Sequence, residues 1–110
     1  MANNEFDVLD AAERAVERIN RLIDRSPRRL SHVPQMRHSA QSISANIREG
    51  FGRGIGGRIR FLRVARGETE ETLRHLSANY RSSRIVAAEY WPLHVLLVVI
   101  VKRLNSLIGS

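Results

Sequence analysis

The sequence contains no cysteine, which excludes disulfide bridges, thiolate metal sites and cysteine nucleophiles, and fits a reducing compartment. Aromatic residues make up only 5% of the 110 residues, which predicts a core built mainly from aliphatic side chains. The longest apolar run, residues 95–101, falls short of the roughly 20 residues of a membrane-spanning helix. We therefore expect a buried helix there and no membrane partner. The chain begins without the basic start and apolar stretch of a secretion signal, so we expect a cytoplasmic protein.

Lysine is nearly absent, because seventeen of the eighteen basic side chains are arginine. The net charge of +7 is uneven along the chain: residues 1–24 sum to −3, residues 25–66 to +9 and residues 67–110 to +1. Arginine is the planar donor that suits phosphate and nucleobase contacts. The basic middle therefore predicts an acidic partner, RNA or another nucleic acid being favoured and an acidic protein the alternative. A GC-rich genome would explain the preference for arginine equally well.

Apolar residues recur at intervals of three and four along four segments, which predicts four helices and no strand. The expected helices cover about residues 5–25, 34–49, 58 to the mid-80s, and 91 to about 108. Proline 34 and proline 92 suit first helical turns, whereas five glycines within residues 50–57 predict a flexible loop. A chain of 110 residues supports one core. We therefore predict one all-α domain over residues 1–110, an antiparallel up-down-up-down four-helix bundle.

The last predicted helix is apolar nearly all round, because Leu96, Val98, Val99 and Val101 lie outside its main apolar stripe. A helix that is apolar on every side has to be buried on every side. Each helix of a monomeric four-helix bundle has one wet face, so this composition predicts a homo-oligomer.

No catalytic, cofactor or metal site emerges from the motifs. The glycines of residues 52–57 match the dinucleotide-binding spacing, but no predicted strand precedes them, and that fingerprint works only between a strand and a helix. Glu71 and His75 are four residues apart, whereas the di-iron sites of helical bundles use a spacing of three and repeat it on a second helix. No serine sits on a nucleophile elbow. We therefore expect a protein that is not an enzyme and carries no cofactor.

The candidate nucleic-acid-binding residues are arginines on either side of the glycine-rich segment and near the first helix connection. Arginine next to glycine can mould to a phosphate backbone. The main predicted cluster consists of Arg53, Arg58, Arg60, Arg63 and Arg66, and the second of Arg28, Arg29 and Arg37.

A polar network is the third expectation. Asn46 and Glu49 are three residues apart on one helix face, near the apolar stripe, so we expect them to be partly buried. A buried carboxylate needs compensating donors, which arginines 37, 58, 60 or 63 could provide. Glu71, expected to hydrogen-bond His75 within its helix, completes the set of predicted structural polar residues.

Residues 42–53 read SISANIREGFGR, and residues 61–67, FLRVARG, are followed by Glu71. These two spaced motifs resemble the four-helix-bundle family encoded in intervening sequences of bacterial 23S ribosomal RNA genes. The resemblance implies an up-down bundle that assembles as a ring-like homopentamer without known enzymatic activity. A distant relative is the basic accessory protein of diversity-generating retroelements, which engages nucleic acid and reverse transcriptase. The sequence departs from the family pattern at Glu68, where serine is common, and in the extra glycines of residues 54–57.

Overall fold

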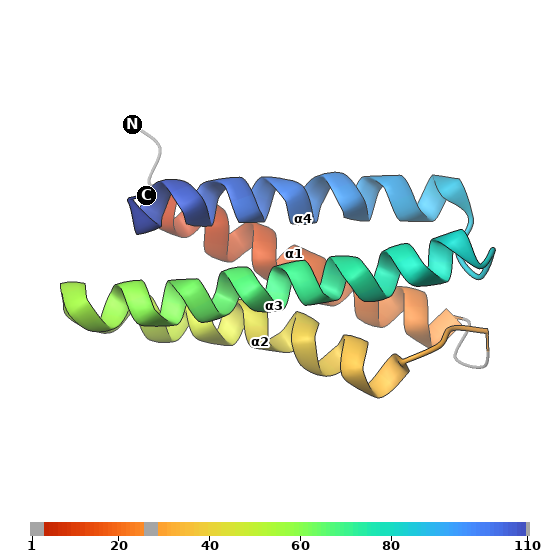
Figure 1. Ribbon diagram of the computed structural model, residues 1–110, viewed down its shortest axis with the longest axis horizontal. Helices are drawn as coiled ribbons and strands as arrows, with labels where there is room; N and C mark the ends of the chain where they lie inside the picture. Colours follow the sequence, from red (N-terminus) through yellow and green to blue (C-terminus); the bar gives the residue numbers. More distant parts are fainter. Residues whose placement is uncertain (1–3, 26–28, 110) are drawn as a thin grey trace.

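The computed structural model describes residues 4–25 and 29–109, and this part of the chain forms four helices and no strand (Figure 1). The helices are α1 (Asn4–Arg25), α2 (Val33–Phe51), α3 (Ile55–Arg81) and α4 (Ala87–Ile108). Successive helices run in opposite directions along the long axis in Figure 1. Both α2 and α4 pack against α1 and against α3, which closes the bundle. The predicted all-α class is confirmed.

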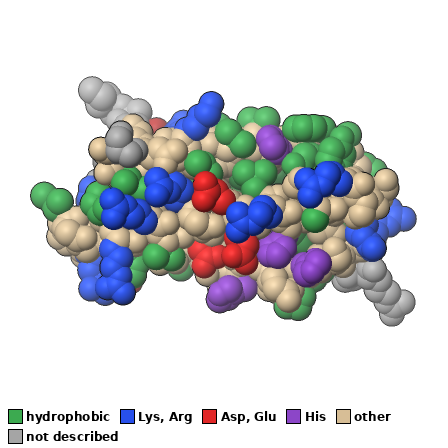
Figure 2. All heavy atoms as spheres, viewed as in Figure 1, with side chains coloured by type: hydrophobic (Ala, Val, Ile, Leu, Met, Phe, Trp, Pro, Cys, Tyr) green, Lys and Arg blue, Asp and Glu red, His purple; other side chains and the backbone are tan. Residues whose placement is uncertain are grey.

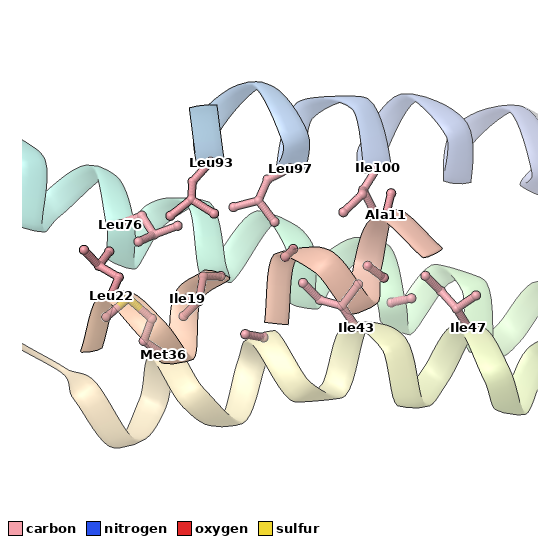
Figure 3. Close-up of a cluster of buried hydrophobic side chains, with 14 of the residues drawn as sticks. Ala11, Ile19, Leu22, Met36, Ile43, Ile47, Leu76, Leu93, Leu97 and Ile100 are labelled. Atoms are coloured by element: carbon pink, nitrogen blue, oxygen red, sulfur yellow. The ribbon is translucent and has the colours of Figure 1, made fainter. Parts of the chain in front are cut away.

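The core is mainly aliphatic, as the low aromatic content predicts, and all four helices contribute buried side chains to it. In Figure 3, Ile19 of α1, Met36 and Ile43 of α2, Leu76 of α3 and Leu97 of α4 point toward the same interior. All five are fully buried. The spacing of three and four between apolar residues places them on one stripe of each helix, and burial of these stripes stabilises the bundle.

The connection between α2 and α3 is shorter than the glycine content suggests. Only residues 52–54 are outside a helix, because α2 continues to Phe51 and α3 begins at Ile55. A Cβ atom on Gly50 would lie 3.3 Å from both the Arg58 carbonyl oxygen and the Phe61 Cβ. Glycine at position 50 therefore lets the two helices approach closely, and the prediction of an eight-residue loop over residues 50–57 was wrong.

The boundaries of α3 and α4 also differ from prediction. Helix α3 ends at Arg81 rather than in the mid-80s, and α4 begins at Ala87, which places Pro92 inside the helix instead of at its start. Proline at position 92 has no N–H to donate to the carbonyl of Ala88. Because Ala88 lies in the exposed first turn, water can satisfy that carbonyl and the helix continues.

Helix α4 is buried on one side only within the single chain, so the homo-oligomer that its composition predicts stays a prediction. Trp91 is 47% exposed and Val95 is 58% exposed. Figure 2 shows hydrophobic side chains gathered on the surface over the first half of α4. By length and composition α4 could cross a membrane, and only 22% of its most apolar stretch is buried in the bundle. However, Leu93, Leu97 and Leu104 belong to the core, which a membrane crossing by α4 would dismantle.

Candidate nucleic-acid interface

The turn from α2 to α3 brings four of the five arginines of the main predicted cluster to one end of the bundle. Arg53 lies in the turn, and arginines 58, 60 and 63 follow in the first turns of α3. Figure 2 shows blue side chains over this end, whereas red and purple ones lie nearer the middle of the same face. We call Arg53, Arg58, Arg60 and Arg63 the basic end.

Two of these arginines are held in place by aromatic rings. The Arg53 guanidinium lies 5.0 Å from the centroid of the Phe61 ring, and that of Arg58 lies 5.3 Å from the centroid of the Phe51 ring. The Nε and Nη2 atoms of Arg53 also donate to Glu49 Oε2, at 3.0 and 2.6 Å. A guanidinium ordered in this way loses less side-chain entropy when it binds an anion.

Arg60 and Arg63 are exposed, and neither forms a hydrogen bond or ion pair with any described residue. The nearest feature to Arg60 is the Phe61 ring, whose centroid is 5.9 Å from the guanidinium carbon. Both cations are therefore available to an external anion. Ile55, at the start of α3, is 85% exposed beside them.

Arg66 does not belong to the basic end. Its Nη1 donates to the Asn105 Oδ1 at 2.8 Å, which joins α3 to α4 in a partly buried contact. Positions 58 to 66 span about two helical turns, and a rotation of 100° per residue spreads the four arginines of this part of α3 around more than half of the helix. The structure therefore assigns Arg66 to packing between the helices.

The second predicted cluster is not assembled as a free basic patch. Arg37 is engaged with α1, since its Nη2 lies 2.6 Å from Asp24 and its Nη1 donates to Asn20 at 2.8 Å. Arg29 is exposed in the connection between α1 and α2, and Arg28 lies outside the described residues. The Arg84 guanidinium, which the sequence did not single out, donates to the Arg29 carbonyl at 2.9 Å.

The predicted polar network is also absent from the described residues, because its members bond separately. The Asn46 amide donates to the Ser42 carbonyl of its own helix at 2.8 Å. Glu49 is exposed and pairs with Arg53, not with a buried donor. Glu71 Oε2 lies 3.5 Å from His75 Nε2, but the two do not form the expected hydrogen bond. A spacing of three residues defines a common face but not whether that face points inward.

The buried polar contacts lie elsewhere, between α2 and α3 and between α3 and the connection that precedes α2. The hydroxyls of Ser39 and Thr72 are 2.8 Å apart in the core, and the fully buried Asn79 binds the backbone of Ser31. The contact between Ser39 and Thr72 could have been predicted from the sequence, because both residues lie on the inward stripes of their helices. The partner of Asn79 is 48 residues away in the chain, which spacing alone cannot reveal.

Two motifs weighed from the sequence can be placed. The glycine-rich dinucleotide-like segment follows the helix α2 rather than a strand, so the context that such a fingerprint requires is missing. Among the described residues, no group of three or more His, Asp or Glu side chains is arranged to hold a metal ion.

The fold and surface define a small, basic four-helix-bundle protein. The chain belongs to the 23S rRNA-intervening sequence protein family, whose model matches residues 4–106. This confirms the resemblance carried by residues 42–71. The chain is also similar to the crystal structure of a protein of unknown function from the S23 ribosomal protein family of Bacteroides thetaiotaomicron. The TM-score is 0.89 and the identity 26%, over 98% of this chain and 100% of the other. No curated protein matches the sequence.

Proposed function

We propose that the protein is a non-enzymatic, cytoplasmic RNA-binding protein that uses the basic end to contact phosphates. The observation that carries this proposal is the concentration of four arginines at the turn from α2 to α3, with Glu49 as the carboxylate paired there. Two of the arginines are oriented by phenylalanine rings and two are exposed without a described partner. Arginine arranged in this way suits bidentate recognition of phosphate.

The charge elsewhere on the bundle supports the same choice of surface. Acidic residues of α1 pair with basic residues of its neighbours, as Asp24 does with Arg37, Glu13 with Arg48 and Asp7 with Arg103. These pairs leave little unmatched positive charge along α1. Part of the excess positive charge therefore lies at the basic end, and a polyanion is attracted there through electrostatic steering.

The proposal includes self-association, with a ring-like pentamer as the assembly that the family resemblance implies. Val95 is exposed on α4 and, with Leu96 and Val99, lines a groove of about 420 Å³ beside α1. Covering this apolar face with a second copy removes it from water. A ring would repeat the basic end around its circumference, so a weak phosphate contact would be multiplied by avidity.

The test is a titration of structured RNA at several salt concentrations, read by fluorescence anisotropy. We expect the affinity to fall steeply with salt, because each phosphate contact releases condensed counterions. In the double variant Arg60→Gln/Arg63→Gln, the logarithmic salt slope should fall by about 1 for each contact removed. A matched control is Arg21→Gln/Arg25→Gln, which removes the same charge from exposed arginines that pair with Glu17 and Glu89 and do not line the groove with Leu96 and Val99.

A loss of affinity in the control as large as that in the basic-end variant would show that only net charge matters. A flat salt slope would exclude phosphate contacts as the source of affinity. Absence of binding at low salt would favour the alternative partner, an acidic protein.

A further inference from the structure

A pocket between α3 and α4 lies at the opposite end of the bundle from the basic end. It has a volume of about 310 Å³, at the lower limit for small-molecule pockets. Three residues one turn apart on α3 face two residues of α4 across it. The lining residues are Leu73, Arg74, Ser77, Arg81, Tyr90 and His94.

The wall formed by α4 belongs to a cluster of aromatic rings in fixed orientations. The rings of Tyr80 and Tyr90 stack at a centroid distance of 4.2 Å, and the Tyr90 hydroxyl lies 3.0 Å from His94 Nδ1. The indole of Trp91 donates from Nε1 to the Tyr80 hydroxyl at 3.2 Å. Its ring meets that of His94 edge to face, with centroids 5.0 Å apart. Trp91 is therefore a half-exposed, ordered ring that does not line the pocket itself but packs against two residues that do, Tyr90 and His94.

The wall formed by α3 is cationic. Arg74 is exposed and forms no hydrogen bond or ion pair with a described residue, and Arg81 donates only to Ser77 within the same wall, at 2.6 Å. None of the six lining residues is acidic. The grooves beside α1 differ, because each has a carboxylate in its wall: Glu89 in one, Asp7 and Asp10 in another, Glu13 in a third.

We propose that this pocket binds one unpaired nucleotide of a single RNA strand. The base would stack on the exposed ring surface of Trp91 and His94, and the phosphate would lie between the guanidinium groups of Arg74 and Arg81. Stacking on aromatic side chains together with a cationic track for the backbone is the general mode of single-strand recognition. A half-exposed tryptophan beside two arginines and no carboxylate matches the chemistry of a nucleotide better than that of a neutral ligand or an acidic side chain alone.

This inference rests on the proposed function for its choice of ligand but concerns a separate surface. The basic end would hold the phosphates of structured RNA. The pocket would select an unpaired nucleotide that adjoins the structured part of the RNA or lies at a strand end. The two sites can be separated by variants, because no residue belongs to both.

The experiment uses the intrinsic fluorescence of Trp91, which is the only tryptophan in the chain. The probe is a six-nucleotide oligoadenylate, with adenosine monophosphate as a second arm that separates a strand from a free nucleotide. We expect saturable quenching of Trp91 by the oligonucleotide and at least tenfold weaker binding of the mononucleotide. The variant Arg74→Gln/Arg81→Gln should weaken oligonucleotide binding at least tenfold, whereas Arg60→Gln/Arg63→Gln should retain the quenching.

All four arginines are exposed, so these substitutions should leave the fold intact, and circular dichroism checks that they do. Unchanged Trp91 fluorescence while anisotropy shows bound oligonucleotide would overturn the pocket but leave the basic end standing. Equal quenching in the Arg74→Gln/Arg81→Gln variant would overturn it as well. Trp91 shielded from acrylamide in the free protein would show that another copy covers the pocket, which also contradicts the inference. Loss of structured-RNA binding only in Arg60→Gln/Arg63→Gln would separate the two sites.

Discussion

Asn79 is the residue that ties the connection between α1 and α2 to the body of the bundle. Its side-chain amide donates to the carbonyls of Ser31 and His75, at 3.1 and 2.8 Å, and its Oδ1 accepts from the Ser31 backbone N–H at 2.8 Å. The residue is fully buried, so these bonds satisfy polar atoms that water cannot reach. The position therefore specifies one arrangement of the connection, because alternatives leave an amide without partners.

We expect Asn79→Ala to lower the free energy of unfolding by about 1–3 kcal/mol, because the partly buried backbone of Ser31 loses both of its Asn79 partners. The measurement is urea denaturation followed by circular dichroism. Asn46→Ala is the matched control, since Asn46 is only partly buried and donates to Ser42 within its own helix. Equal losses in both variants would show that the cross-chain contact of Asn79 adds nothing beyond a local hydrogen bond.

At the scale of helices, two glycines in similar helical settings serve different purposes. Gly50, near the end of α2, is buried, and a Cβ there would press on Arg58 and Phe61 of α3. Gly67 lies exposed in the middle of α3, and a Cβ there would meet no atom within 4 Å. The first glycine is required by packing within the chain, whereas the second costs helix stability without any contact in the chain that requires it.

Alanine at these two positions should therefore have opposite effects in thermal or urea denaturation. Gly67→Ala should raise the free energy of unfolding by about 0.5–1 kcal/mol. Gly50→Ala should lower it by about 1–3 kcal/mol, because the backbone of α3 has to move away from the added methyl group. A destabilising Gly67→Ala would contradict the prediction and indicate that another chain approaches α3 at that glycine.

The sequence predicts an element well when its signal is local and poorly when the signal depends on a distant partner. The periodic apolar stripe placed the first helix at about 5–25, and the structure has α1 at Asn4–Arg25. Glycine content misplaced the turn before α3, because helix formation there depends on the close contact between Gly50 and Arg58. Arg66 was wrongly grouped with the other arginines of the nucleic-acid site. Its hydrogen-bond partner, Asn105, is 39 residues away, so the sequence did not reveal that contact. The contacts of Phe51 and Phe61 with arginines were missed because they cross the turn between α2 and α3, whose geometry the sequence did not predict.

At the scale of the whole molecule, charge and apolar surface are separated in space. The basic end lies at the turn from α2 to α3, whereas the exposed Val95 and the apolar groove that it lines lie along α4. The groove between α1 and α4 also has Asp10, Arg14 and Arg103 in its walls, so it carries both negative and positive side chains. Copies that met through α4 would leave the basic ends uncovered. Self-association and RNA binding are therefore compatible in one assembly.

This separation leads to a prediction about both properties at once. Val95→Glu places a charge at the centre of the exposed face of α4 without touching the core, so light scattering should show a lower mass than that of the native oligomer. Because avidity is lost, the apparent affinity for structured RNA should fall tenfold or more, although the basic end is intact.

Val86→Glu is the control, since Val86 is also 58% exposed but precedes α4 and lies off that face. It adds the same charge and should keep both mass and affinity. Assembly through α4 would be contradicted by a native chain that scatters light as a monomer or by a Val95→Glu variant with unchanged mass. A lower mass without any loss of affinity would exclude avidity as the source of RNA binding.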